Sequence, residues 1–334
     1  MKPLACSALL LMLLPGFALL EARQSTVYVS VVSTKLFVVG APNPQTGLFY
    51  QKTSDDTLWQ HTGRNNIRAF GVDVHTPSRG DVLCIASGNG VHQTADGGKT
   101  WKITTGWRIT EVLSVAIDPR TANTIYCSTP YGVYKTTDGG TTWNERTSGM
   151  GTLFVQTVLI DRNNPETLYC GTEQGVYRSD DGAATWKKTG LHVGGVRSLA
   201  QHPHKSEVLF VGTDDFGIYA TSNGGAYWDK MAAGLDHVAF YTLVFDPTNA
   251  DIMYAGGYIT GVYKSVDGGQ SWRRMNDGLT NLNVHSIAVD PTNGNRVYAG
   301  TMFGGVFKSE NGGTTWRYAG LGGSQVWTMT VQPF

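Results

Sequence analysis

The octapeptide SVDGGQSW at residues 265–272 is one of six similar segments, each of which ends in a tryptophan. The tryptophans of these segments, together with Trp59, recur every 42 to 44 residues along the chain. A fixed period of this length indicates a repeat architecture, in which each unit is one supersecondary motif. The other copies are TADGGKTW (94–101), TTDGGTTW (136–143), SDDGAATW (179–186), TSNGGAYW (221–228) and SENGGTTW (309–316), and KTSDDTLW (52–59) is a degenerate copy without the glycines.

Each copy of this segment, called the repeated turn below, has the composition of a tight turn. The Ser or Thr at its first position and the Asp or Asn at its third can accept hydrogen bonds from nearby backbone N–H groups. The glycine pair permits positive φ at no steric cost, and the tryptophan begins an outer strand and packs on the neighbouring unit. Asn223 and Asn311 keep the acceptor oxygen without the charge. We therefore interpret the aspartates of the repeated turn as structural rather than catalytic.

Every unit contains four short β segments and no helical pattern. One unit reads VLSVAID (112–118), TIYCST (124–129), GVYKTT (132–137) and TWNERT (142–147), with β-branched and aromatic residues bounded by Pro, Asn, Asp or Gly. Four strands in about 40–45 residues are typical of a propeller blade. The seven tryptophans therefore predict an all-β, seven-bladed β-propeller of four-stranded antiparallel blades, with the repeated turns between the third and fourth strands.

The repeated turn, with the Asp-Pro pair that follows several inner strands, resembles the Asp-box or bacterial neuraminidase repeat. The pair stands at Asp118-Pro119, Asp246-Pro247 and Asp290-Pro291. The resemblance covers nearly the whole chain after its N-terminal segment, and it implies the propeller fold. The family includes sialidases, xyloglucan-degrading endoglucanases, sortilin-type receptors and photosystem II assembly factors, so the resemblance implies no single function.

The two ends of the chain are expected to share one blade. QVWTMTVQP (325–333) matches the first strand of a unit, and no further strand follows it. We expect this C-terminal segment to be the inner strand of the blade that carries Trp59, because such closure removes exposed sheet edges. The alternative inner strand is VYVSVV (27–32). The other strands of this blade are expected around KLFVVG (35–40), GLFYQKT (47–53) and LWQHT (58–62).

The N-terminus has the pattern of an export signal. A lysine precedes an apolar run (4–14), and small residues favour cleavage after Ala18 or Ala22. An uncleaved anchor is the alternative, although the run is short for a membrane span of about 20 residues. We expect a signal peptide over 1–22 and the propeller over 23–334, in a secreted or periplasmic protein that has no membrane attachment after cleavage.

Composition narrows the classes of partner. Lysine plus arginine equals aspartate plus glutamate at 26 each, and no basic run occurs, which argues against a nucleic-acid partner. Cys84, Cys127 and Cys170 recur at the repeat period. Equivalent positions in neighbouring blades lie roughly 10 Å apart, too far for a disulfide, so we interpret these cysteines as small buried apolar residues. We expect no metal, no cofactor and a monomer.

One position at the start of the inner strand does not follow the repeat, although the residues on either side of it do. Val precedes this position and Ser or Thr follows it in most units. Because it occurs once per blade at the central mouth, we expect its side chains to line the axial opening; the alternative is an exposed position that is free to vary. The residues assigned to this position are Arg68, Leu113, Gln156, Arg197, Tyr241, His285 and Trp327.

Loops on the same face of the propeller carry further candidates. The loops that enter the inner strands and those that join the second and third strands share this face, whereas the repeated turns lie at the opposite end. Aromatic rings beside charged groups suit the binding of sugar rings or a peptide, although such rings also pack under loops. The ligand-binding candidates in these loops are Trp107, Arg108, Tyr131 and Phe216.

The same face also contains the candidates for catalysis. A glycoside hydrolase normally needs two carboxylates about 5 to 9.5 Å apart. Nothing in the spacing of the available carboxylates singles out a pair, and the Arg-Ile-Pro motif of the similar sialidases is absent. We therefore expect an exported, non-catalytic recognition or scaffold propeller that binds a glycan or a protein at its axial face; the alternative is a glycoside hydrolase that acts on a polysaccharide. The weak catalytic candidates are Glu111, Glu173, Asp214 and Asp215.

Overall fold

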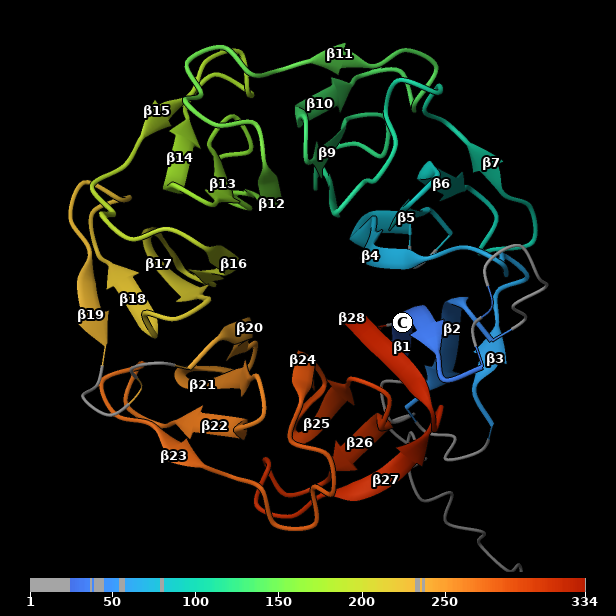
Figure 1. Cartoon of the computed structure of the whole chain (residues 1–334), viewed down its shortest axis with the longest axis vertical. Coiled ribbons are helices and arrows are strands. Elements are labelled where there is room, and N and C mark those ends of the chain that lie inside the picture. Colours follow the sequence, from blue (N-terminus) through green and yellow to red (C-terminus); the bar gives the residue numbers. More distant parts are fainter. Residues whose placement is uncertain are drawn as a thin grey trace, which may run out of the picture.

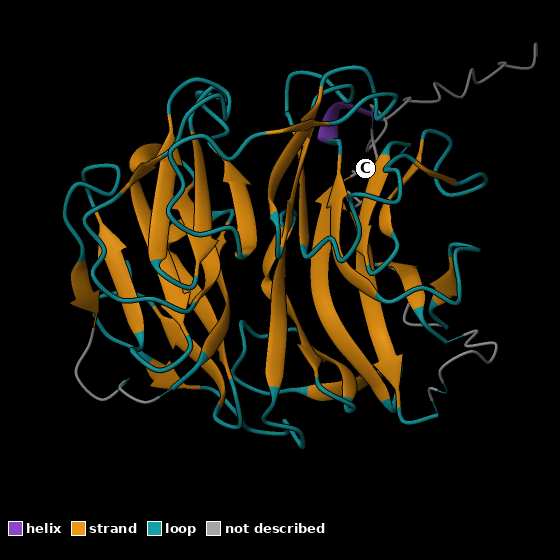
Figure 2. Cartoon of the chain, turned by 45° about the horizontal axis from the view of Figure 1, so that its top comes forward, coloured by secondary structure: helices purple, strands orange, loops and turns teal. Residues whose placement is uncertain are grey.

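The computed structural model describes residues 25–36, 38, 45–53, 58–78, 81–231, 235 and 238–333. These residues form seven four-stranded antiparallel sheets around a central axis, which confirms the predicted seven-bladed propeller (Figure 1). The strands run between the two faces of the ring, and loops connect them at both faces (Figure 2). We number the blades 1 to 6 in chain order, starting with the blade that begins at β4, and we name the sheet formed by both chain ends the closing blade.

In every blade the strands follow the same order from the axis outward (Figure 1). The inner strands are β4 (Ala69–Val74), β8 (Ser114–Ile117), β12 (Val155–Ile160), β16 (Val196–His202), β20 (Phe240–Asp246), β24 (Val284–Asp290) and β28 (Ser324–Pro333). The second strands are β5 (Leu83–Ser87), β9 (Ile125–Thr129), β13 (Leu168–Thr172), β17 (Lys205–Thr213), β21 (Asn249–Gly257), β25 (Asn293–Thr301) and β1 (Ser25–Thr34).

The two outer positions of each blade differ in length. The outer strands are short, and among the described residues the only helix is the 3-10 helix η1 (Thr76–Ser78). The third strands are β6 (Gly90–Thr94), β10 (Gly132–Thr136), β14 (Gly175–Ser179), β18 (Ile218–Thr221), β22 (Gly261–Ser265), β26 (Gly305–Ser309) and β2 (Gly47–Lys52). The outer strands are β7 (Lys102–Ile103), β11 (Asn144–Glu145), β15 (Lys187–Lys188), β19 (Asp229–Met231), β23 (Arg273–Arg274), β27 (Arg317–Gly320) and β3 (Gln60–His61).

The repeated turn joins the third strand to the outer strand through side-chain hydrogen bonds. In blade 1, the Gly98 N–H donates to Thr94 Oγ1 at 3.0 Å. Thr100 donates its backbone N–H and its hydroxyl to the Asp96 carboxylate at 2.9 and 2.6 Å. Asn223 accepts the equivalent backbone hydrogen bond at 2.9 Å in blade 4. The side chain at this position therefore acts as a geometric acceptor, which does not require a charge.

The tryptophan that ends each turn connects neighbouring blades. Trp316 is 5% exposed, and its Nε1 donates to the backbone oxygen of Met275, just beyond the outer strand of the preceding blade. Trp186 makes the equivalent bond to the Arg146 oxygen at 2.9 Å. In the closing blade, Trp59 Nε1 donates to the Ala319 oxygen in β27 at 2.7 Å. In six of the seven blades the indole N–H thus donates to the preceding blade, whereas Trp272 donates to the Gly269 oxygen of its own turn.

The turn carboxylates predict part of the acid sensitivity of the fold. The pKa of four of these aspartates is lowered to about 2, mainly by hydrogen bonds that the carboxylate accepts from the residue four positions later. A carboxylate whose pKa is lower in the folded state stabilises the fold above its unfolded-state pKa of about 4, and this contribution is lost as the pH falls towards 2. The four residues are Asp96, Asp138, Asp181 and Asp267.

We expect the quadruple variant with Asn at these four positions to melt below the wild type at pH 7. The difference in Tm should close as the pH is lowered from 4 to 2, because asparagine does not titrate while the aspartates become protonated. Thermal melts followed by circular dichroism across this range provide the measurement. A difference in Tm that stays constant between pH 7 and pH 2 would contradict the assignment of these carboxylates as hydrogen-bonded anions.

The closing blade has the strand order β28-β1-β2-β3, which confirms closure by the C-terminal strand. Val27 pairs with Val331 and Val29 with Met329, so apolar side chains of β1 and β28 are in register. VYVSVV lies in β1 and is therefore the second strand, not the inner strand. The second strand had been expected around KLFVVG (35–40), of which only Lys35, Leu36 and Val38 are described, after the end of β1. The alternating buried valines of β1 explain why that segment pairs instead.

The three cysteines of the propeller lie in the second strands β5, β9 and β13, but only two of them are at equivalent positions. Cys127 and Cys170 pair with Tyr134 and Tyr177 of the third strands. Cys84 lies one residue earlier in its strand and pairs with Gln93, so the prediction of one shared position is wrong for Cys84. Cys84, Cys127 and Cys170 are fully buried and form no disulfide. Burial raises the pKa of each thiol. Their interpretation as small buried apolar residues is confirmed.

Candidate functional site at the axial cavity

Six of the seven inner strands contain an irregularity near their start that turns one side chain towards the axis. In β12, Val155 pairs with Thr172 and Thr157 pairs with Gly171, which leaves Gln156 without a partner across the ladder. A β-bulge of this kind re-aims the extra side chain. Five other inner strands contain the same shift, and Leu113 takes the equivalent place in blade 2. The bulged residues are Phe70, Gln156, Arg197, Tyr241, His285 and Trp327.

Glycines in the second strands allow the inner strands to approach one another. Gly300 pairs with Ser286, the residue after the bulge in blade 6. A Cβ atom at Gly300 would lie 2.3 Å from Cγ1 of Val326 in the closing blade, so only glycine fits there. Close approach of adjacent inner strands holds the bulged side chains together around the axis.

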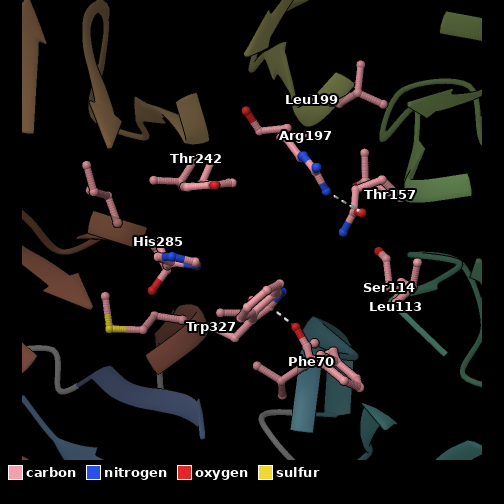
Figure 3. A pocket seen from close by; sticks show the side chains of 18 of the residues that line it. Phe70, Leu113, Ser114, Thr157, Arg197, Leu199, Thr242, His285 and Trp327 are labelled. Atoms are coloured by element: carbon pink, nitrogen blue, oxygen red, sulfur yellow. Dashed lines mark hydrogen bonds between the residues drawn. The ribbon is translucent and has the colours of Figure 1, made fainter. Parts of the chain in front are cut away.

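The seven predicted residues all line one axial cavity of about 610 Å³ (Figure 3). The register differs from the prediction in blade 1, where Ala69 pairs with Ser87 and Gly71 with Ala86. Phe70, and not Arg68, therefore occupies the bulged position. Arg68 lines the cavity from the residue before β4, and its guanidinium lies 5.1 Å from the centre of the Phe70 ring.

Four side chains form a continuous arc of rings, which we name the aromatic arc: Phe70, Trp327, His285 and Tyr241. Tyr241 stacks on His285 with ring centres 4.4 Å apart, and His285 lies 4.9 Å from Trp327. Trp327 meets Phe70 edge to face at 5.8 Å. The arc spans blades 5 and 6, the closing blade and blade 1. Tyr258, from the β21–β22 loop, extends it with an edge contact to Tyr241 at 6.0 Å.

Polar side chains of blades 3 and 4 form the Arg197 cluster, which consists of Arg197, Asp214 and Gln156. Arg197 Nε donates to Asp214 Oδ1 at 2.5 Å, and Arg197 Nη1 donates to Gln156 Oε1 at 3.0 Å. The hydrogen bond to Asp214 is the main cause that raises the pKa of Arg197. Arg197 Nη2 and Gln156 Nε2 make no hydrogen bond to the described residues, so both remain donors for a ligand.

His285 is the most buried polar side chain of the aromatic arc. It is 5% exposed, and its Nε2 has no hydrogen-bond partner among the described residues. Burial, and secondly the charge of Arg197, lower the pKa of His285 to about 4, so the imidazole is neutral at pH 7. A buried nitrogen without a partner costs about 1–3 kcal/mol.

The other predicted residues lie outside the lining of this cavity. Trp107 is 82% exposed, with the Arg108 guanidinium 5.1 Å from the centre of its ring. Tyr131 and Phe216 are 56% and 47% exposed in the loops between second and third strands. These four residues belong to the loops around the mouth, and the structure does not bring them into the axial site.

The predicted catalytic carboxylates do not converge in the cavity. Glu111, Glu173 and Asp215 are exposed in loops, and Asp214 is paired with Arg197. No Asp or Glu is among the described residues that line the cavity. The described part of the chain also contains no group of three or more His, Cys, Asp or Glu side chains placed to hold a metal ion. No helix within it is long and apolar enough to cross a membrane.

Comparison with known proteins shows similarity in structure alone. No protein-family model matches the chain, and no curated protein sequence does. A GH74 xyloglucanase from Xanthomonas campestris superposes with a TM-score of 0.65 at 16% identity, over 84% of this chain and 52% of that enzyme. A GH74 enzyme from Niastella koreensis gives 0.61 at 21% identity, over 78% and 45%. This chain thus spans about half the length of these enzymes.

Two further solved structures are not described as enzymes. YCF48 bound to D1 peptide gives a TM-score of 0.59 at 18% identity, over 75% of this chain and 81% of that one. The extracellular domain assigned to a hybrid two-component system of B. thetaiotaomicron gives 0.63 at 18% identity, over 84% and 38%. All of these sequence identities are below 25%, so the similarity shows the fold and does not indicate the function. By strand order, register and structural similarity, the chain is a seven-bladed β-propeller.

Proposed function

We propose that this propeller is a non-catalytic recognition module that binds a glycan or a protein segment in its axial cavity. The observation that carries the proposal is the position of the aromatic arc and the Arg197 cluster in one cavity of about 610 Å³. This volume lies within the range of roughly 300–1,000 Å³ that is common for ligand sites. Rings for apolar contact and a few polar groups for orientation are the usual composition of such sites.

A glycan is the ligand class that this composition favours. A sugar ring presents C–H groups on its faces and hydroxyl groups at its rim, which match the aromatic rings and the unpaired donors respectively. Trp327 and Tyr241 supply exposed ring surface, while Gln156 Nε2 and Arg197 Nη2 supply donors.

A protein segment is the second candidate, because one structurally similar propeller, YCF48, is known in complex with a peptide. Exposed aromatic residues with a neighbouring arginine, such as Trp107 and Arg108, are enriched at protein interfaces. Those residues lie in the loops around the mouth, where a longer peptide could contact them in addition to the cavity.

Hydrolysis is less well supported than binding. A glycosidase needs two carboxylates on either side of the scissile bond, whereas the lining residues in the described structure include none. Asp214 accepts a hydrogen bond from Arg197 and is not among the described residues that line the cavity, so it is not placed beside a ligand there. The structural similarity to xyloglucanases therefore supports a shared fold more than a shared hydrolytic activity.

The remaining proposals concern the whole protein. We propose membership of the Asp-box propellers, supported by the hydrogen bonds of the repeated turn. We also propose a signal peptide over 1–22, which lies outside the described residues, a propeller over 23–334, and a secreted or periplasmic monomer. N-terminal sequencing of the exported protein tests the boundary between the signal peptide and the propeller, and light scattering tests whether the protein is a monomer.

Binding without hydrolysis is the expected result on polysaccharide and oligosaccharide arrays. Incubation of the purified protein with each bound polysaccharide should release no reducing ends above the level of a heat-denatured sample, because the described residues that line the cavity include no carboxylate. A Tyr241→Ala variant should show weaker binding on the same array, since it removes one ring of the arc. Release of reducing sugar that disappears in Asp214→Ala or Glu173→Ala would favour the glycoside hydrolase instead.

A further inference from the structure

The Arg197 guanidinium is already engaged by side chains of this chain. Its Nε donates to Asp214 Oδ1 and its Nη1 to Gln156 Oε1. A carboxylate binds arginine most strongly in a bidentate arrangement, through two nitrogens of one edge. Each of the two edges here has one nitrogen committed to a partner within the chain. What remains for a ligand is Nη2, which suits single hydrogen bonds to hydroxyl or carbonyl oxygens.

Asp214 also offsets the positive charge of Arg197. The side chains of Arg197 and Asp214 are 34% and 36% exposed, so this ion pair lies at the cavity wall and is partly shielded from solvent. Glu173 is close enough to contribute to the raised pKa of Arg197, and it adds negative charge on the same side. Asp214 and Glu173 do not line the cavity, but both lie close to Arg197, so their negative charge lowers the attraction of Arg197 for a ligand carboxylate.

The other charged and titratable groups at the cavity do not reverse this balance. His285 is neutral at pH 7. Arg68 is exposed at the mouth and lies over the Phe70 ring, where solvent and salt screen its charge. No carboxylate and no further cation is among the described lining residues. The lining of the cavity thus combines rings, aliphatic side chains, neutral polar groups and two arginines, of which Arg197 is paired within the chain.

We propose that Asp214 is a specificity-determining residue, which sets the axial cavity to bind neutral glycans and to exclude acidic ones. This inference rests on the proposed glycan-binding function. Hydroxyl groups of a neutral sugar accept hydrogen bonds from Arg197 Nη2 and Gln156 Nε2 while the ring lies against the aromatic arc. A uronic acid in the same place either remains unpaired beside Asp214 or displaces it from Arg197, and both alternatives weaken binding.

The test uses pairs of oligosaccharides that differ only at C6. We suggest hexasaccharides of β-1,4-glucan, β-1,4-mannan and β-1,4-galactan, each with a counterpart in which the primary hydroxyl groups are oxidised to carboxylates. Isothermal titration at pH 7 gives the affinity ratio of each pair for the wild type, Asp214→Ala and Asp215→Ala. Asp215 is the matched control, because it is an exposed carboxylate in the same loop and has no hydrogen bond or ion pair to the described residues.

The wild type should bind the neutral member of a pair at least about tenfold more tightly, as expected for one unsatisfied charged group. Asp214→Ala should reverse the preference, since it frees the Nε edge of Arg197 for the ligand carboxylate. Asp215→Ala should keep the wild-type ratio. Thermal melts of each variant verify folding, and Asp214→Asn, which removes the charge and retains an acceptor for Nε, replaces Asp214→Ala if the latter does not fold.

Three outcomes would overturn the inference. The first is that the wild type binds both members of a pair with equal affinity. If Trp327→Ala still abolishes binding in that case, the proposed function remains intact and only the role of Asp214 is wrong. The second is an unchanged ratio in Asp214→Ala, and the third is an equal shift in Asp215→Ala, which would indicate a general charge effect. Absence of binding to every member of every pair contradicts the glycan-binding function itself, and this inference with it.

Discussion

Removal of residues 324–334 is expected to abolish folding of the propeller. The deleted segment contains β28, the inner strand of the closing blade, which pairs with β1 along the whole strand. Val326 and Met329 are 0% and 6% exposed, and each contributes about 1.5–3 kcal/mol through burial. Thr328 Oγ1 donates to the Phe70 oxygen at 2.9 Å and so connects the closing blade to blade 1.

The free energy lost with the buried side chains and hydrogen bonds of β28 is therefore comparable to the entire stability of a domain, which is roughly 5–15 kcal/mol. Truncation also exposes the edge of β1, which favours aggregation. Circular dichroism and a thermal melt of the truncated chain should show no cooperative transition, and a synthetic peptide of residues 324–333 added in trans should restore one. A truncated chain that melts at the wild-type Tm would show that β28 does not close the ring.

Trp327→Ala is expected to weaken ligand binding by about 30-fold to 1,000-fold while the propeller stays folded. Trp327 is the largest side chain of the aromatic arc, lies between Phe70 and His285, and is only partly buried. Removal of a central aromatic contact in a binding site typically costs about 2–4 kcal/mol. The measurement is titration of the variant with the oligosaccharide or peptide that binds the wild type on an array.

Trp107→Ala provides the matched control for this variant. Trp107 is 82% exposed in the loop before blade 2, so its removal changes the exposed aromatic surface but not the cavity lining. We expect at most a few-fold loss of affinity for an oligosaccharide. If Trp107→Ala weakens oligosaccharide binding as much as Trp327→Ala does, the site lies on the loops around the mouth and not in the axial cavity.

The fold was predictable because its local determinants repeat. Each repeated turn has an acceptor at its third position and a tryptophan at its end. The acceptors make the same hydrogen bonds in successive blades, and every tryptophan except Trp272 donates to the preceding blade. The closing blade was harder to predict, since its repeated turn is degenerate and its strands come from both ends of the chain. The choice of β1 as second strand depends on pairing between Val29 and Met329, residues 300 positions apart, and no local pattern reveals that register.

Part of the site was predictable because a position that varies from unit to unit has a side chain that is not packed in the core. Comparison of the units identified six of the side chains at the bulged position, from Leu113 to Trp327, because the residues around them repeat. Phe70 was missed because Gly71 stands where other blades have Ser or Thr. Alignment of the buried Ala69 with the Val of other blades would have found it.

The partnership of Arg197 with Asp214 and Gln156 could not be predicted from sequence. These residues come from two blades and a loop, and their contact depends on the bulges of β12 and β16. The pairing changes the role of Asp214 from a candidate acid to a partner that fixes an arginine. The cavity therefore has two different sides. Blades 5, 6 and 1 and the closing blade contribute the aromatic arc, and blades 3 and 4 contribute the Arg197 cluster.

The most direct test of the central claim is a crystal structure of the protein with an oligosaccharide that binds on the array. We expect ligand density in the axial cavity, with a sugar ring against Trp327 or Tyr241 and a ligand oxygen within hydrogen-bond distance of Arg197 Nη2 or Gln156 Nε2. Density for the ligand only at the outer strands or between blades, with the axial cavity empty of it, would contradict the account.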